Sequence, residues 1–107
     1  MSTSVRRPGD HAPSSEAVQA DLETLHALSN ETRYEALRSI AAAENGRCVC
    51  EIEPALNVSQ GAVSQALGRL TDAGLLERRK EGRWRYYEAT PKAERLLETL
   101  DAIRVDS

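Results

Sequence analysis

The chain has 107 residues and a net charge of −3, and 40% of its residues are hydrophobic and 29% charged, which fits one small globular domain. No apolar run is long enough to cross a membrane, and Arg6 and Arg7 are not followed by the apolar segment of a signal peptide. The two cysteines, Cys48 and Cys50, are too few for a disulfide-stapled secreted scaffold, so we expect a cytoplasmic protein.

The first part of the chain predicts a tail and two helices. Residues 1–14 contain one large aliphatic side chain, Val5, and are expected to form a disordered tail, followed by one domain over residues 15–107. Ser15 is the expected N-cap of a first helix. Four aliphatic side chains at helical spacing form its apolar stripe: Val18, Leu22, Leu25 and Leu28. Ser29 or Asn30 caps a second helix, which residues 45–46 end.

The middle of the chain has the order of a helix-turn-helix. Pro54 limits any helix in residues 47–56 to a short or irregular one, and residues 57–59 form a tight turn. Ser59 then caps a longer helix that ends at residues 73–74. Three side chains give that helix its inward face: Val63, Leu67 and Leu70. A short helix, a turn and a capped helix predict a DNA-binding helix-turn-helix.

The other face of the longer helix carries small or hydrogen-bonding residues, which suit a helix that enters the major groove of DNA. Together with the capping Ser59, they are Gln60, Gly61, Ser64, Gln65, Gly68 and Arg69. Glutamine can bond bidentately to adenine, and serine can bind a phosphate. The alternative interpretation is a polar helix face without a partner.

A β-hairpin follows, with strands expected at residues 75–80 and 83–88 around a turn at residues 81–82. Five cations crowd it: Arg78, Arg79, Lys80, Arg83 and Arg85. Residues 59–87 carry six basic and three acidic side chains, so their charge is +3 while the rest of the chain has −6. This distribution is typical of a surface that binds phosphates, and the hairpin is expected to act as a wing against flanking phosphates or the minor groove. A solvated charged surface is the alternative.

Thr90 and Pro91 start a last helix. Its apolar face consists of Leu96, Leu97, Leu100 and Ile103. Trp84 and Tyr87 are expected to pack the hairpin onto the helices. The predicted fold is mainly α with a β-hairpin wing, a winged helix-turn-helix of order α-α-α-α-β-β-α. The apolar stripes of the first and last helices exceed the needs of this core, so we expect a homodimer through them and a palindromic operator in double-stranded DNA.

Five segments together resemble the arsenic-repressor (ArsR/SmtB) family of winged helix-turn-helix, metal-responsive regulators. They are residues 28–33 (LSNETR), 48–51 (CVCE), 58–67 (VSQGAVSQAL), 73–76 (AGLL) and 82–87 (GRWRYY). The resemblance covers about residues 20–103. It implies a homodimeric repressor that leaves its operator when it binds a thiophilic ion or another inducer. Asn30 and Glu31 replace the family's usual Asp-Pro, and Ala66 replaces a frequent His, which alters the residues expected to face the groove.

Cys48 and Cys50 are the candidate ligands of an ion, because two thiolates can bind As(III), Sb(III), Cd(II) or Zn(II). Side chains two residues apart diverge on a helix but lie on one side of an extended segment. An ion that joins both sulfurs would therefore oppose a helical arrangement and reposition Gln60 and Ser64. The resemblance assigns arsenite-type induction, with As(III) or Sb(III) as inducer, to this position.

Some family members carry a third cysteine where this chain has Glu53. A third ligand would then come from solvent, a small thiol or the partner subunit. The alternatives are an inert buried cysteine pair and a redox-active one, although a disulfide across one residue is strained. Residues 90–105 contain no histidine, which argues against a zinc-type site there, and a lone residue such as His26 is more often a surface or interface residue than a ligand.

An enzyme is the opposing class of function. The sequence has no Ser/His/Asp arrangement, paired-carboxylate context, P-loop or GxGxxG motif, so we expect neither enzymatic activity nor an obligatory cofactor. Two further alternatives keep the fold. One is a soft-metal-binding module that binds no operator, and the other is a winged-helix regulator with idle cysteines that senses an organic ligand or nothing.

Overall fold

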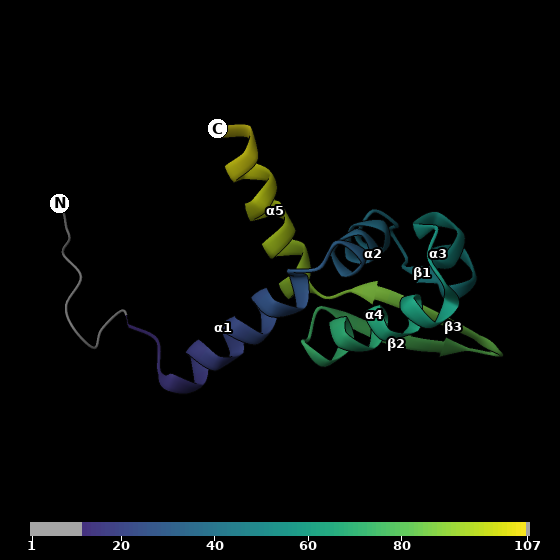
Figure 1. Cartoon of the computed structure of the whole chain (residues 1–107), viewed down its shortest axis with the longest axis horizontal. Coiled ribbons are helices and arrows are strands. Elements are labelled where there is room, and N and C mark those ends of the chain that lie inside the picture. The colour runs from purple at the N-terminus through teal and green to yellow at the C-terminus, as the bar shows by residue number, and fades with distance from the viewer. Residues whose placement is uncertain (1–11, 107) are drawn as a thin grey trace.

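The computed structural model describes residues 12–106, without the side chains of residues 53, 55 and 106. The elements follow one another as α1 (Ser15–Leu28), α2 (Glu31–Ala41), β1 (Arg47–Cys48), α3 (Val49–Leu56), α4 (Gln60–Asp72), β2 (Leu76–Glu81), β3 (Trp84–Ala89) and α5 (Pro91–Asp106). They form the predicted arrangement of helices around a β-hairpin wing (Figure 1). Residues 1–11 of the predicted tail lie outside the described residues.

Side-chain caps start most of the helices, as the sequence predicted. Asn30 Oδ1 accepts a hydrogen bond from the Arg33 amide, and Ser59 Oγ accepts one from the Ala62 amide. The cap of α1 was predicted one residue too late, because Ser14 rather than Ser15 accepts from the Ala17 amide. Two adjacent serines offer the same side chain, and only the backbone conformation of Ser14 is extended as a cap requires.

The sheet has three antiparallel strands in the order β1-β3-β2. The sequence did not predict β1, whose two residues carry no alternating pattern and exist as a strand only because Arg47 and Cys48 pair with β3. The hairpin turn was predicted one residue too early. Glu81 pairs with Trp84, so residues 82–83 form the turn, and Gly82 supplies the left-handed conformation (φ 62°) that its first position needs.

The core lies between α2, α3, α4, α5 and the inner face of the sheet. Its largest fully buried side chains are Leu37, Ile40, Ile52, Val63, Leu67, Leu70, Leu75 and Leu76. The predicted inward face of α4 is therefore confirmed. Tyr87 is buried as expected, but the prediction for Trp84 was wrong, because this side chain sits beside the hairpin turn, beyond the core, and is 52% exposed. In the described part of the chain, no helix has the length and hydropathy needed to span a membrane.

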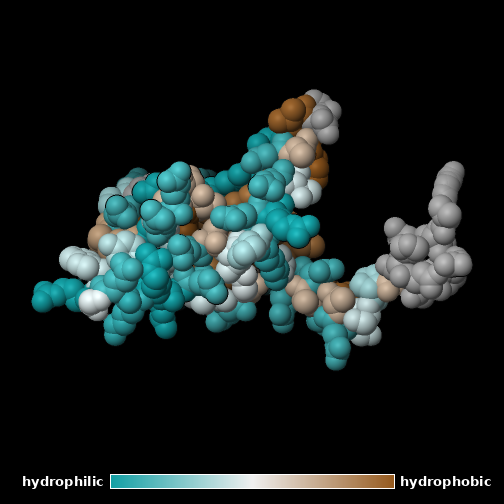
Figure 2. Space-filling view, turned by 180° about the vertical axis from the view of Figure 1, so that it is seen from behind, coloured by the Kyte–Doolittle hydropathy of each residue, from teal (hydrophilic) through white to brown (hydrophobic). Residues whose placement is uncertain are grey.

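The helices α1 and α5 project away from the body that holds the wing (Figure 1). Both carry large apolar side chains that remain exposed in the single chain: Val18, Leu22, Leu25, Ile103 and Val105. Figure 2 shows apolar side chains along α1 and at the end of α5, whereas the wing end of the molecule is hydrophilic. The buried residues of α1 are Thr24 and Ala27, so most of the predicted apolar stripe of α1 is not buried within one chain.

Candidate nucleic-acid interface and thiol site

The helix-turn-helix consists of α3, the turn at residues 57–59 and α4. Asn57 adopts a left-handed conformation (φ 56°), which reverses the chain, and the Ser59 cap then starts α4. All of the polar residues predicted to face a groove are exposed: Ser59, Gln60, Gly61, Ser64, Gln65, Gly68 and Arg69. The turn and the buried stripe of α4 thus hold one small, polar helix face toward solvent.

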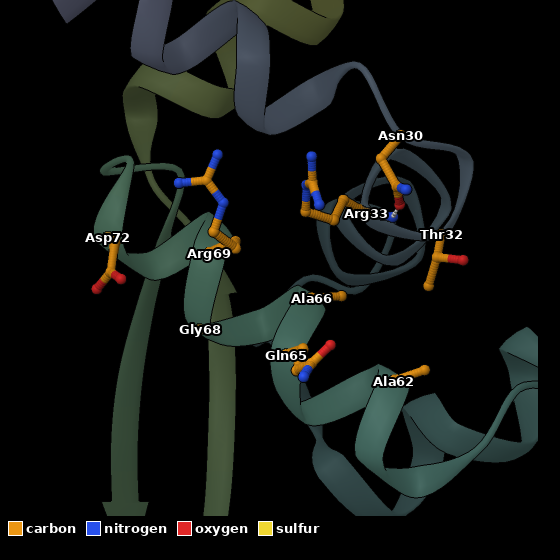
Figure 3. A pocket seen from close by; sticks show the side chains of 9 residues that line it. All are labelled: Asn30, Thr32, Arg33, Ala62, Gln65, Ala66, Gly68, Arg69 and Asp72. Carbon is orange, nitrogen blue, oxygen red and sulfur yellow. Dashed lines mark hydrogen bonds between the residues drawn. The ribbon is translucent and has the colours of Figure 1, made fainter.

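Ala66 is a correction to the expected groove-facing set. It is 4% exposed and lies at the edge of the inward face of α4, three residues after Val63. It forms the floor of a hollow of about 600 Å³ between the start of α2 and the side of α4 (Figure 3). The hollow is lined by Asn30, Thr32, Arg33, Ala62, Gln65, Ala66, Gly68, Arg69 and Asp72.

Two arginines of this hollow connect it to α1. Arg33 Nε and Nη2 donate to the carbonyls of Ala27 and His26, at 2.6 and 3.1 Å, and so satisfy the C-terminal end of α1. Arg69 Nη2 lies 3.3 Å from His26 Nδ1. His26 therefore contacts a cation of α4 and is not part of a ligand cluster in the described residues. Arg33 was not among the predicted site residues, although its position three residues after the Asn30 cap places its side chain near the end of α1.

The wing separates its cations between two faces. Directly opposite residues of an antiparallel pair share a face, and Lys80 is opposite Arg85 while Arg78 is opposite the buried Tyr87. Arg78, Lys80 and Arg85 therefore share one face, where they line a hollow of about 310 Å³. All three are exposed, and like charges held side by side repel unless an anion lies between them.

Arg79 lies on the other face and has internal partners. Its guanidinium pairs with Glu88 at 3.0 Å and with Glu81 at 3.2 Å, and it lies over the Tyr86 ring at 5.2 Å. Of the five predicted wing cations, Arg79 is thus already neutralised within the hairpin, whereas Arg83, the second residue of the turn, is exposed.

The cysteine pair lies at the junction of β1 and α3. Cys48 is the last residue of β1 and is buried, while Cys50 is in the first turn of α3 and is exposed. Because the chain changes from strand to helix between them, the two sulfurs converge, and the Cys50 thiol donates to Cys48 Sγ at 2.7 Å. This hydrogen bond raises the pKa of the Cys50 thiol, and partial desolvation and the charges of Cys48 and Glu51 add to the shift. Both cysteines are free thiols.

Glu51 positions the start of α3. Its Oε1 accepts a hydrogen bond from the Cys48 amide at 3.0 Å, which is the side-chain-to-cap contact of a capping box. In the described residues, no group of three or more His, Cys, Asp or Glu side chains could hold a metal ion. The side chain of Glu53, at the position of a third family cysteine, lies outside what the structure describes.

The two thiols open into a cavity of about 470 Å³ between the helix-turn-helix and the wing. It is lined by Cys48, Val49, Cys50, Gln60, Arg83, Trp84 and Arg85. Pairing of Cys48 with Tyr86 across β1 and β3 brings the thiols beside the wing residues. The cysteines and the wing were predicted as separate sites, and in the structure they line one cavity.

The family model of the bacterial regulatory proteins of the arsR family matches residues 30–78. The putative arsenical resistance operon repressor ArsR2 of Halobacterium salinarum is 60% identical over 90 residues, which cover 84% of this chain and 76% of that protein. The putative arsenical resistance operon repressor ArsR of the same organism is 45% identical over 95 residues, which cover 89% and 74%.

Solved structures share the fold. HlyU from Vibrio cholerae is 26% identical with a TM-score of 0.74, covering 84% of this chain and 97% of HlyU. A homodimeric winged helix-turn-helix DNA-binding domain from Mycobacterium bovis has a TM-score of 0.80 at 24% identity, covering 94% and 92%. The winged helix-turn-helix prediction is confirmed. The matching family consists of DNA-binding regulators and not of enzymes, as expected. With relatives of this identity and coverage, the chain belongs to the arsR family of bacterial regulatory proteins.

Proposed function

We propose that the chain is a transcriptional repressor that leaves its operator when a thiophilic ion, arsenite or antimonite in particular, binds Cys48 and Cys50. The observation that carries this proposal is the 2.7 Å approach of the two sulfurs at the start of α3. Metal–thiolate bonds are about 2.3 Å long, which places two sulfurs on one ion about 3.5–3.8 Å apart, so these sulfurs need to separate by only about 1 Å to share an ion. The relatives named as arsenical resistance operon repressors support As(III) and Sb(III) over Cd(II) and Zn(II).

The α4 face supports direct contact with double-stranded DNA. A Cβ atom added to Gly61 or Gly68 would meet nothing within 4 Å, so packing within the chain does not explain either glycine. Glycine inside a helix costs about 0.5–1 kcal/mol relative to alanine. A backbone that must approach a groove closely explains this cost, with Ser64 and Gln65 beside the glycines as candidate base and phosphate contacts.

The exposed apolar residues of α1 and α5 support a homodimer. Both helices project away from the body, and a second copy of the chain would bury the apolar side chains that they expose. Two copies related by a two-fold axis present two α4 helices, so the operator is proposed to be palindromic with half-sites about one helical turn apart.

The ion acts on the first helix of the helix-turn-helix. A bond from one ion to both sulfurs replaces the Cys50-to-Cys48 hydrogen bond and fixes the junction between β1 and α3. Since α3 packs against α4, a shift of α3 changes the position of Gln60 at the start of α4. Release requires that the ion bind the DNA-free arrangement more tightly than the DNA-bound one. A repressor acts where the DNA is, so the proposal keeps the expected cytoplasmic location.

The test is a titration of the full chain against a labelled duplex from upstream of its own gene, followed by fluorescence anisotropy. Arsenite, antimonite, Cd(II), Zn(II) and peroxide are added separately to the wild type and to Cys48→Ser and Cys50→Ser. We expect arsenite and antimonite to release the wild type, and both variants to bind the duplex normally but to resist release. Release of either variant at the wild-type ion concentration, or no release by any ion, contradicts the proposal. Release by peroxide alone supports a redox function instead.

A further inference from the structure

We propose that a small anionic thiol completes the coordination of the inducer, seated in the cavity that Cys48 and Cys50 share with the wing. This inference rests on the proposed function and names the ligand class that its thiol site takes. Arsenic(III) forms three bonds, and this chain offers two converging sulfurs. In the described residues no third metal ligand accompanies them, so the third bond has to come from outside these side chains.

The cavity selects the charge of that outside ligand. Arg83 and Arg85 line it, both are exposed, and neither forms an ion pair with any described residue. The described lining contains no acidic side chain, while the amide of Gln60 adds a hydrogen-bonding group and Trp84 an aromatic wall. A volume of about 470 Å³ exceeds what an ion alone needs and falls in the range of small-molecule sites. A thiol that carries carboxylates fits this combination of space and positive charge.

The assembly reaction is balanced without an oxidant. Arsenite enters as As(OH)₃, and three As–O bonds break while three As–S bonds form, two to the cysteine sulfurs and one to the small thiol. Each thiol proton leaves with one hydroxide as water, so three waters are released and arsenic stays trivalent. The carboxylates of the small thiol then pair with Arg83 and Arg85.

This arrangement places the inducer on residues that the proposed function assigns to DNA. Gln60 opens α4, and Arg83 and Arg85 belong to the cationic wing. An anion seated between them neutralises the charges that would otherwise meet DNA phosphates. The small thiol therefore contributes to release by occupying part of the DNA surface, in addition to any shift of α3.

The test measures arsenite binding to the DNA-free full chain through the fluorescence of Trp84, the single tryptophan of the sequence, which lines the cavity. Titrations are run under nitrogen with one thiol at a time: mercaptosuccinate (anionic), 2-mercaptoethanol (neutral) or cysteamine (cationic). The wild type is compared with the double variant Arg83→Gln/Arg85→Gln. The matched control is Arg78→Gln/Lys80→Gln, which removes the same charge from the same hairpin outside this cavity. Each thiol also binds arsenite in solution, so variants are compared at equal thiol concentration.

We expect the cavity variant to bind arsenite about fivefold more weakly than the wild type in mercaptosuccinate, a difference of about 1 kcal/mol. In 2-mercaptoethanol and cysteamine, and for the control variant in any thiol, the change should stay within about twofold. An equal loss of arsenite affinity in all three thiols, or no loss in mercaptosuccinate, overturns the proposal of an anionic thiol. In either case, release of DNA by arsenite leaves the repressor proposal standing. If arsenite neither changes the Trp84 signal nor releases DNA with any thiol, both proposals fail.

Discussion

Arg38 of α2 and Asp101 of α5 form a bidentate ion pair, with Nη1 3.1 Å from Oδ2 and Nη2 2.8 Å from Oδ1. The same guanidinium receives support from Tyr34, whose hydroxyl accepts hydrogen bonds from Nε and Nη2 at 2.9 and 2.7 Å. Arg104 adds a second cation on Asp101 Oδ1. This pair ties the C-terminal half of α5 to the core helix α2, and so helps to set the direction in which α5 leaves the body.

The first prediction concerns the pH dependence that this pair gives to stability. The hydrogen bond from Arg38, and after it that from Arg104, lowers the pKa of Asp101 below its ordinary value of about 3.9. The contribution of the ion pair to the free energy of unfolding is therefore fully present above pH ~4 and is lost as the pH falls through the lowered pKa. In denaturant unfolding, the free energy of unfolding of Asp101→Asn should be lower than that of the wild type at pH 6, and the two values should converge toward pH 2. A difference that persists unchanged at pH 2 contradicts this assignment.

Gly46 precedes β1 and supports a second prediction. Its φ is +83°, and an added Cβ would lie 2.6 Å from the Tyr87 carbonyl oxygen and from Glu88 Cγ. Gly46→Ala should destabilise the chain by about 2 kcal/mol, because it combines an unfavourable conformation with a backbone clash. Gly82→Ala is the control, since it has a φ of +62° but no neighbour within 4 Å and should cost about 1 kcal/mol. Thermal and urea unfolding measure both, and equal losses would show that the clash is relieved.

Local signals were enough to predict most of the elements. Ser59 and Asn30 cap helices through contacts three residues away, and the pattern of Val63, Leu67 and Leu70 repeats within one helix. Patterns that span only a few residues, such as these, can be recognised in the sequence. The burial of Ala66 follows from the same kind of spacing, three residues after Val63, although the sequence prediction placed Ala66 among the groove-facing residues.

Long-range pairing explains what the sequence did not reveal. The strand β1 exists because Cys48 pairs with Tyr86, which lies far along the chain. That pairing also creates the cavity between the thiols and the wing, so a local sequence pattern could not predict the cavity. The internal partners of Arg79 likewise depend on the register of the hairpin, because a shift of one residue would move each side chain of the strand to the other face of the sheet. The chemistry of each residue was therefore predictable, but its neighbours were not.

The proposed dimer gives a third prediction. Leu22 and Leu25 of α1 are 53% and 58% exposed in the single chain. Leu22→Glu/Leu25→Glu should convert a dimer to a monomer in sedimentation velocity at micromolar concentration, because two buried charges without partners would oppose association. Ala20→Glu adds charge at an exposed position on the opposite face of the same helix and should leave the dimer intact. A wild type that sediments as a monomer, or a double variant that remains dimeric, contradicts an interface through α1.

The two faces of the wing give a fourth prediction. Lys80 and Arg85 lie on the face with free cations, and Arg79 is neutralised by Glu81 and Glu88. Replacing Lys80 and Arg85 by alanine should weaken binding to all duplex sequences about equally and reduce the slope of log K against log salt by about 2. Arg79→Ala should leave that slope nearly unchanged. Anisotropy titrations between 50 and 200 mM salt provide the measurement, and a larger change of slope for Arg79→Ala would show that the wrong face was assigned to DNA.

Gly68 separates stability from DNA binding in the last prediction. It lies in the interior of α4, is exposed, and leaves open space around an added Cβ. Gly68→Ala should therefore stabilise the folded chain by about 0.5–1 kcal/mol, since alanine favours the helix and meets no clash. The same methyl group should weaken operator binding, because it stands where the helix backbone approaches the groove. The exposed Thr99→Ala in α5 serves as control for unchanged DNA affinity. Urea unfolding and anisotropy on the same samples decide the outcome: a variant that gains stability and binds the operator as tightly as the wild type would mean that this face of α4 does not approach DNA closely.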